Sequence, residues 1–193
     1  MPDKPSYLGL LNAVSCAETR AHQYLTAWAD VTKDPEVRAV LLKVAAREGE
    51  HGMSFAKRIN ELGFELQVTE DPHFEEQMAI ACSTECSDLE KAEALNLLRF
   101  CTDDGEPDIF DNFFRDHSID IRTGELLGRY IAEERDTLRL FQACHAQLSA
   151  QATAAAPGGD RLATLEDKID TVCRAVEELR QIVCAQAMPT TAA

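Results

Sequence analysis

Apolar residues recur at spacings of three and four along most of this 193-residue chain, and that periodicity is the strongest constraint on its fold. Over residues 34–62 the pattern is formed by Leu41, Val44, Ala45, Phe55, Ile59 and Leu62. We find no stretch of alternating β-branched residues bounded by turn signals, which would be typical of strands. The sequence therefore predicts an all-α protein.

Proline, glycine and capping residues divide the periodic pattern into four helical regions. The predicted regions are 6–30, 34–62, 72–101 and 119–149. Asp34 supplies an N-cap with Pro35 at the first helical position, and Gly63 is suited to end the same helix. Whether 72–101 is one helix or two stays open, because residues 83–88 (STECSD) are rich in weak helix formers. A short first connection and a long middle one predict a four-helix bundle.

The end of the chain has a different pattern from this bundle, which is expected to span residues 1–149. Residues 150–160 have the composition of a linker. Beyond it, over residues 161–187, a heptad seam is formed by Leu162, Leu165, Ile169, Val172, Val176, Leu179 and Val183. Mostly β-branched residues at the a positions and mostly leucine at the d positions favour a parallel two-stranded coiled coil. This C-terminal helix would pair between chains in a homo-oligomer or dock back on its own bundle.

Composition and charge exclude several classes of function. The formal net charge of −15 argues against a nucleic-acid partner, and no apolar run approaches the ~18 residues of a membrane span. The N-terminus lacks the basic and apolar regions of a signal peptide. Seven cysteines form no CxxC pair, as expected for reduced thiols. We therefore expect a cytoplasmic protein that binds neither a membrane nor a nucleic acid.

Three carboxylates and a histidine occupy positions that the helical pattern turns toward the core. Glu48 lies on the apolar stripe of the second helix and His51 lies beside that stripe, one turn on, while Glu18 and Glu134 lie on the stripes of the first and fourth helices. All three glutamates fall near the midpoints of their predicted helices, so they can share one level of the bundle. Burying such charges is costly unless something neutralises them. In four-helix bundles, inward glutamates with Glu-x-x-His pairs build di-metal sites.

The fourth helix leaves two alternatives open. A shift of one residue would turn Glu133 and Asp136 inward in place of Glu134, which lies on the better apolar stripe. Tyr130, on the same helix, would either donate a hydrogen bond or a radical at the site or pack in the core.

The third helical region offers Glu90 and Glu93 as candidate ligands, with Glu85 as a fallback. Ser87-x-x-Glu90 is also a capping box, in which the Glu90 carboxylate would accept hydrogen bonds at a helix start. The sequence leaves both roles open for Glu90.

These motifs resemble those of a known family. The segment VAAREGEH (44–51) resembles the Glu-x-x-His segment of rubrerythrins and other ferritin-like di-iron proteins, and Glu90-x-x-Glu93 is similar to the Glu-x-x-Glu on the third helix of rubrerythrins. The resemblance covers roughly residues 6–149 and implies an iron or mixed-metal pair bridged by carboxylates. By match to the motif, the implied metal ligands are Glu18, Glu48, His51, Glu90, Glu93 and Glu134.

Two departures from that family pattern matter for function. The second Glu-x-x-His is absent, since Thr137 stands where its histidine would be, and no rubredoxin-like CxxC pair could deliver electrons. Any electron donor would therefore be external. Oxygen-rich ligands suit iron, or manganese in its place. We expect redox chemistry on peroxide, dioxygen or ferrous iron; the alternative is a non-catalytic bundle with a degenerate metal site, acting in assembly or partner binding through its C-terminal helix.

Overall fold

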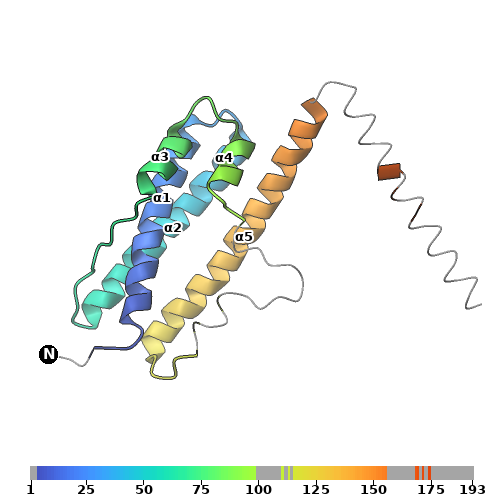
Figure 1. The fold of residues 1–193 in the computed structure, drawn as a ribbon. Coiled ribbons are helices and arrows are strands. Elements are labelled where there is room, and N and C mark those ends of the chain that lie inside the picture. Colours follow the sequence, from blue (N-terminus) through green and yellow to red (C-terminus); the bar gives the residue numbers. More distant parts are fainter. Residues whose placement is uncertain are drawn as a thin grey trace, which may run out of the picture. The chain divides into compact units, whose positions relative to one another are not determined.

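The computed structural model describes residues 4–98, 110, 113 and 115–155, together with four positions further along the chain, 168, 169, 171 and 174. Its helices are α1 (Leu8–Val31), α2 (Pro35–Glu61), α3 (Phe74–Cys82), α4 (Asp88–Ala94) and α5 (Ile121–Ala155). Figure 1 shows α1, α2 and α5 as long helices and α3 and α4 as short ones. The described residues contain no strand, and none of their helices is long and apolar enough to span a bilayer. The predicted all-α class is confirmed.

Contacts divide the chain into two compact units, Met1–Leu148 and Ser149–Ala193, and α5 runs across the division. The sequence placed the end of this helix at 149 and a linker at 150–160. The helix instead continues to Ala155, because four of the six residues from 150 to 155 are alanine, the strongest helix former. Residues 156–160 lie outside the described residues. So does most of the predicted heptad helix at 161–187, whose four described positions are helical.

A three-residue turn joins α1 to α2, and both helices begin and end within two residues of their predicted bounds. Asp34 caps α2 by accepting hydrogen bonds from the backbone N–H groups of Glu36 and Val37, at 2.8 and 3.2 Å. Pro35 follows as the first helical residue, where its missing N–H leaves no hydrogen bond unmade. The capping signal read from the sequence therefore starts this helix as predicted.

The two helices approach each other closely at Gly52. The hydroxyl of Ser15 on α1 donates a hydrogen bond to the Gly52 carbonyl oxygen on α2, at 2.8 Å. A Cβ atom at Gly52 would lie 2.6 Å from Thr19 Oγ1, 3.2 Å from the Thr19 backbone nitrogen and 3.3 Å from the Ser15 carbonyl oxygen. Only glycine fits this contact, which holds the α1 backbone against the turn of α2 that carries His51.

The described part of the third predicted helical region, residues 72–98, contains two short helices. At the break, Ser83 Oγ accepts hydrogen bonds from the backbone N–H groups of Glu85 and Cys86, both at 3.2 Å. Ser87 then starts α4 through a capping box with Glu90. Serine side chains that bond nearby backbone groups compete with a continuous helix, which explains why the chain breaks here.

Two polar contacts hold α4 beside the C-terminal end of α1. The Asp88 carboxylate accepts hydrogen bonds from Trp28 Nε1 and Thr32 Oγ1, both at 2.6 Å. The buried Lys91 ammonium donates to the Ala81 carbonyl oxygen at 2.9 Å and so joins α4 to α3. Helix α4 therefore lies near the C-terminal end of α1 rather than at its middle.

A polar network fixes the start of α5 against the opposite ends of α1 and α2. The Asp120 carboxylate accepts hydrogen bonds from the backbone N–H groups of Arg122 and Thr123, from the Tyr7 hydroxyl at 2.8 Å and from Arg58 Nη2 at 2.8 Å. Burial opposes ionisation of Asp120, but the hydrogen bonds from Thr123, Tyr7 and Arg58 hold its pKa well below the usual range. The ionised carboxylate is thus a structural part of this junction.

Two apolar clusters fill the first unit, one toward each end of the long helices. The cluster beside α3 and α4 includes Leu25, Trp28, Leu41, Ala92 and Phe141. The cluster at the opposite end includes Leu11, Phe55, Ile59, Leu127 and Ile131. The middle turns of α1, α2 and α5 lie between the segments that form these two apolar clusters. These turns carry buried charged side chains.

Candidate metal centre

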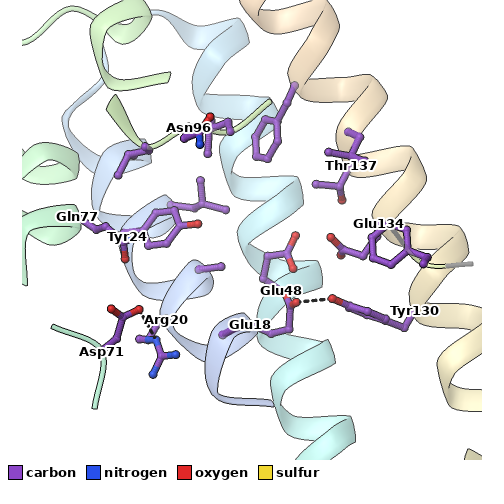
Figure 2. Close-up of a pocket in the computed structure, with 18 of the residues that line it drawn as sticks. Glu18, Arg20, Tyr24, Glu48, Asp71, Gln77, Asn96, Tyr130, Glu134 and Thr137 are labelled. Atoms are coloured by element: carbon purple, nitrogen blue, oxygen red, sulfur yellow. Dashed lines mark hydrogen bonds and ion pairs between the residues drawn. The ribbon is translucent and has the colours of Figure 1, made fainter. Parts of the chain in front are cut away.

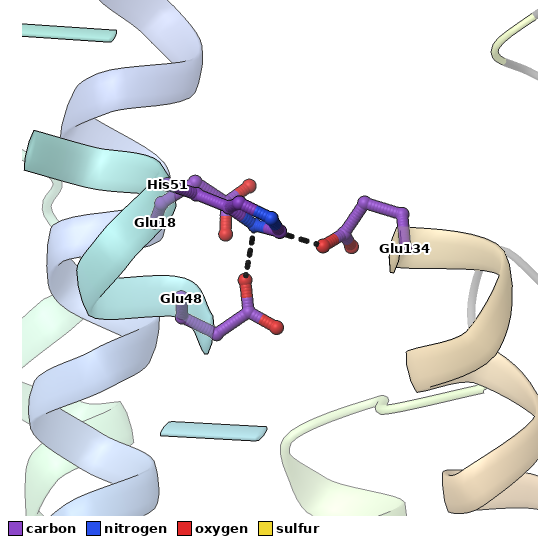
Figure 3. Close-up of side chains that lie close together, drawn as sticks. All are labelled: Glu18, Glu48, His51 and Glu134. Carbon is purple, nitrogen blue, oxygen red and sulfur yellow. Dashed lines mark ion pairs between the residues drawn. The ribbon is translucent and has the colours of Figure 1, made fainter. Parts of the chain in front are cut away.

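Three glutamates and one histidine converge from the three long helices. Glu18 comes from α1, Glu48 and His51 from α2, and Glu134 from α5. The three carboxylates face one another in Figure 2, and Figure 3 shows His51 among them. One ligand atom of each residue lies within 4.8 Å of the corresponding atoms of the other three. This group, called the Glu/His cluster below, could hold a metal ion.

Helical geometry explains how these four side chains meet. Glu48 and His51 are one turn apart and project from the same face of α2. Glu18 is 7 % exposed on the inward stripe of α1, and Glu48 and His51 are each 3 % exposed. The structure brings together four of the six ligands that the sequence predicted.

His51 is oriented by carboxylates on both sides of its ring. Its Nε2 lies 2.7 Å from Glu133 Oε2, outside the cluster, while its Nδ1 lies 3.3 Å from Glu134 Oε1 and 3.6 Å from Glu48 Oε2. With Nε2–H donating to Glu133, the Nδ1 position faces the cluster. Burial alone would lower the pKa of His51, but its contacts with Glu134, Glu48 and Glu133 raise that pKa to about 10. With that pKa, His51 keeps a proton on Nδ1, and a cation would compete with this proton for the nitrogen.

Three buried atoms of the cluster have no hydrogen-bond partner among the described residues. They are Glu48 Oε2, His51 Nδ1 and Glu134 Oε1. An unpartnered buried polar atom costs about 1–3 kcal/mol, and more when it is charged. Burial, reinforced by the neighbouring Glu48 and Glu134, raises the pKa of Glu18 well above its usual value, and burial also raises the pKa of Glu134. A divalent cation would offset the like charges and bond all three atoms, so the residues fit a metal ion.

Tyr130 supports the cluster from α5. Its buried hydroxyl donates a hydrogen bond to Glu18 Oε1 at 2.7 Å, drawn as a dashed line in Figure 2. Its ring packs edge-on against His51 and Phe55, with centroids 5.0 and 5.2 Å apart. Burial and the nearby carboxylates of Glu18 and Glu134 raise the pKa of Tyr130, so the phenol stays a donor. The sequence left hydrogen bonding and packing open, and the structure shows both.

Sequence reasoning missed the side chain that joins α2 to α5 beside the cluster. Arg47 donates hydrogen bonds to the Glu133 carbonyl oxygen at 2.9 Å, to Thr137 Oγ1 at 2.8 Å and to Asp136 Oδ2 at 2.8 Å. Both members of the alternative ligand pair are thereby accounted for, since Glu133 bonds His51 from outside and Asp136 pairs with Arg47. The nearest signal in the sequence was the position of Arg47 directly before Glu48.

The structure does not bring Glu90 or Glu93 into the cluster. Glu90 is exposed, and its carboxylate accepts hydrogen bonds from the Ser87 backbone N–H at 2.7 Å and the Ser87 hydroxyl at 2.8 Å. Glu93 is also exposed, with Oε1 4.0 Å from His145 Nε2, and the fallback Glu85 is exposed as well. These positions follow from the anchoring of α4 at the end of α1, away from the level that Glu18 and Glu48 share.

A cavity of about 240 Å³ adjoins the cluster. Glu18, Glu48 and Glu134 line one part of it, and Figure 2 shows them facing the space from three helices. Leu25 and Phe141 belong to its apolar walls. The carboxylates of the cluster are therefore reachable from this cavity.

Comparisons of the chain with protein-family models, characterised proteins and solved structures find no match. The class of the protein is defined by its own fold and site. It is an all-helical protein with a buried Glu/His cluster that could hold a metal ion.

Proposed function

We propose that the protein is a ferritin-like metalloprotein that binds iron, or manganese in its place, and carries out redox chemistry on peroxide, dioxygen or ferrous iron. The observation that carries this proposal is the convergence of three buried atoms that make no hydrogen bond among the described residues, from Glu48, His51 and Glu134, beside Glu18. Three carboxylates and one imidazole nitrogen form a donor set suited to these metals. The cluster contains no cysteine, which would favour a thiolate-preferring metal.

The proposed architecture is a four-helix bundle. Helices α1, α2 and α5 would be its first, second and fourth helices. The two short helices α3 and α4 would together form the third. The support for it is the order of the elements and the origin of the cluster on three long helices. In ferritin-like bundles the ligands likewise project inward from facing helices.

The residues around the cluster define what the protein would contribute. A bound iron ion would supply electrons and Lewis acidity. Glu18, Glu48, His51 and Glu134 would hold it, while Glu133 fixes the His51 ring and Tyr130 orients Glu18. Four donors are enough for one ion, and a pair would require the carboxylates to bridge two ions and further ligands to join them. Electrons would come from an external donor.

Metal binding tests the proposal directly. Protein reconstituted anaerobically with Fe²⁺ or with Mn²⁺, and then desalted, should retain at least one ion per chain by elemental analysis. Glu134→Ala should lose most of this metal, because it removes one of the four converging ligands. Glu93→Ala is the matched control: Glu93 is exposed and lies outside the cluster, so its loss should leave the metal content unchanged. Wild-type protein that stays metal-free would overturn the proposal.

A second candidate is a non-catalytic bundle with a degenerate metal site. It is favoured by the position of Glu90 and Glu93 outside the cluster and by Thr137 at the place of a second histidine. Such a protein would act in assembly or partner binding through the C-terminal helix, as a homo-oligomer. A metal-free wild type whose self-association depends on residues 161–187 would support it.

A further inference from the structure

We infer that the cavity beside the Glu/His cluster binds a small neutral organic molecule, with an apolar body against the cavity walls and one polar group directed at Glu48 and Glu134. This inference deepens the proposed function, on which it rests, by naming a class of substrate. It is carried by the size of the cavity, the chemistry of its walls and the distribution of charge around it.

The cavity is larger than peroxide or dioxygen requires. Its volume is about 240 Å³. An apolar cavity of roughly 150 Å³ in another protein binds benzene, and one of about 10–15 Å³ holds a water molecule. The space therefore accommodates an organic molecule of about one ring.

The walls of the cavity are largely apolar and come from several elements. Three lining residues belong to the apolar cluster beside α3 and α4: Leu25 on α1, Leu95 after α4 and Phe141 on α5, which are 1 %, 6 % and 8 % exposed. Phe110, 3 % exposed, belongs to the opposite cluster and also lines the cavity. The space thus lies where the two apolar clusters meet beside the carboxylates, and an apolar ligand body would fill it.

The polar part of the cavity presents two carboxylate oxygens that accept no hydrogen bond among the described residues and lie 3.3 and 3.6 Å from His51 Nδ1. Glu48 is 3 % exposed and lines the cavity, and its Oε2 has no hydrogen-bond partner among the described residues. Glu134 lines the cavity as well, and its Oε1 likewise accepts no hydrogen bond among the described residues. A ligand hydroxyl or a similar donor could bond these oxygens, or the ion that they would hold.

Charge selects against an anionic ligand. Arg20 is the one cationic side chain that the described residues place on the cavity lining, and it is already engaged. Its Nη1 donates to the Thr69 carbonyl oxygen at 2.9 Å, and its Nε lies 3.5 Å from Asp71 Oδ2. A carboxylate or phosphate in the cavity would face Glu18 and the other acids of the cluster, with no free cation among the described lining residues.

A helix end forms part of the rim of the cavity. Asn96, which follows α4, has a φ of 49°, and its backbone N–H bonds the Glu93 carbonyl oxygen at 3.0 Å. This left-handed turn at a helix end allows Leu95 and Asn96 both to line the cavity, the first buried and the second exposed. Ala17 on α1 is likewise exposed and lines the cavity. The cavity lining therefore includes residues exposed to solvent.

Fluorine NMR of two ring compounds tests the inference. We would titrate 4-fluorophenol, which is neutral at pH 7, and 4-fluorobenzoate, which is an anion, into wild-type protein without metal and after loading with Mn²⁺. We expect the phenol to bind with a Kd on the order of 1 mM. We expect the benzoate to bind at least tenfold more weakly. Bound Mn²⁺ should broaden the fluorine signal of the phenol, because the cavity adjoins the cluster.

Substitutions on α1 separate the cavity from the metal. Ala21 lines the cavity, so Ala21→Phe should weaken phenol binding at least tenfold and leave the Mn²⁺ content unchanged. Ala17→Phe, at the exposed rim, gives a second variant if Ala21→Phe does not fold. Ala13→Phe is the matched control, because Ala13 is exposed on the same helix and does not line the cavity.

The outcomes distinguish this inference from the proposed function. Wild-type protein that binds Mn²⁺ but not the phenol, or variants at Ala21 and Ala17 that bind the phenol as tightly as wild type, would overturn the cavity as a binding site. Equal binding of the phenol and the benzoate would overturn its preference for a neutral ligand. Phenol binding without any retained Mn²⁺ would support the cavity and contradict the metalloprotein.

Discussion

The substitution Gly52→Ala should loosen the junction on which the candidate metal centre is built. The added methyl group would meet Thr19 Oγ1 at 2.6 Å, and two backbone atoms of α1, at residues 19 and 15, at 3.2 and 3.3 Å. The Thr19 side chain can rotate away, but the backbone atoms can move only if α1 moves. We therefore expect α1 to shift away from α2 and to carry Glu18 away from Glu48.

A matched glycine allows the size of this effect to be isolated. Gly128 is an exposed position inside α5, where an added Cβ meets nothing within 4 Å. Gly128→Ala should therefore stabilise the protein by about 1 kcal/mol through helix propensity alone. Gly52→Ala gains the same propensity but adds an overpacking cost of about 1–3 kcal/mol. The free energies of unfolding of the two variants should thus differ by about 1–3 kcal/mol, with Gly52→Ala the less stable.

Urea unfolding followed by circular dichroism measures that difference. The melting temperatures of the two variants should differ by about 2–4 °C for each kcal/mol in a protein of this length. Metal retention should fall in Gly52→Ala and stay unchanged in Gly128→Ala. Adding Thr19→Ala to Gly52→Ala should restore part of the loss, since it removes the 2.6 Å contact and leaves the two backbone contacts. If both single variants are equally stable, the close approach of α1 and α2 at Gly52 is not as described.

Three further predictions concern other parts of the molecule. Asp120→Asn should lower the free energy of unfolding measured in urea and weaken the dependence of that free energy on pH in the acid range. The folded pKa of Asp120 is lowered, so its contribution to stability is present above about pH 4 and is lost as the pH falls toward the folded value. A variant whose stability falls with acid as steeply as that of the wild type would refute this. Glu48→Gln should raise the melting temperature of the metal-free protein by removing one of several like charges, and should abolish the rise that saturating Mn²⁺ gives the wild type; equal melting of the wild type with and without Mn²⁺ would count against the site. Truncation after residue 156 should lower the oligomeric state in light scattering and leave metal retention intact; an unchanged number of subunits would favour a C-terminal helix that docks back on its own bundle.

The sequence carries enough information to place most of the candidate site. Glu18, Glu48 and Glu134 each lie on an apolar stripe near the middle of a long helix, and helical periodicity with a shared level is sufficient to bring them together. His51 follows from its spacing of one turn from Glu48. These relations are local to each helix, so they survive errors of a few residues in the predicted bounds.

The residues that the sequence misplaced depend on contacts between distant segments. Glu90 and Glu93 were predicted as ligands from their spacing and the family resemblance, with a capping role left open for Glu90 that the structure confirms. Asp88 ties α4 to Trp28 and Thr32 at the end of α1. No periodic pattern contains that contact, and it removes both glutamates from the level of the cluster. The roles of Arg47 and Glu133 were missed for the same reason, because each depends on how α2 and α5 face each other.

The origin of the four ligands on the helices also has a consequence for the order of assembly. The tight α1–α2 hairpin brings Glu18, Glu48 and His51 together through contacts that are close in sequence, and such contacts form early in folding. Glu134 joins them only when the distant α5 docks. We therefore expect a half-built site of two carboxylates and an imidazole to form before the complete one, and a cation captured by that hairpin would draw Glu134 and its helix into place. The metal would then act as a folding partner of the chain before it acts as a cofactor.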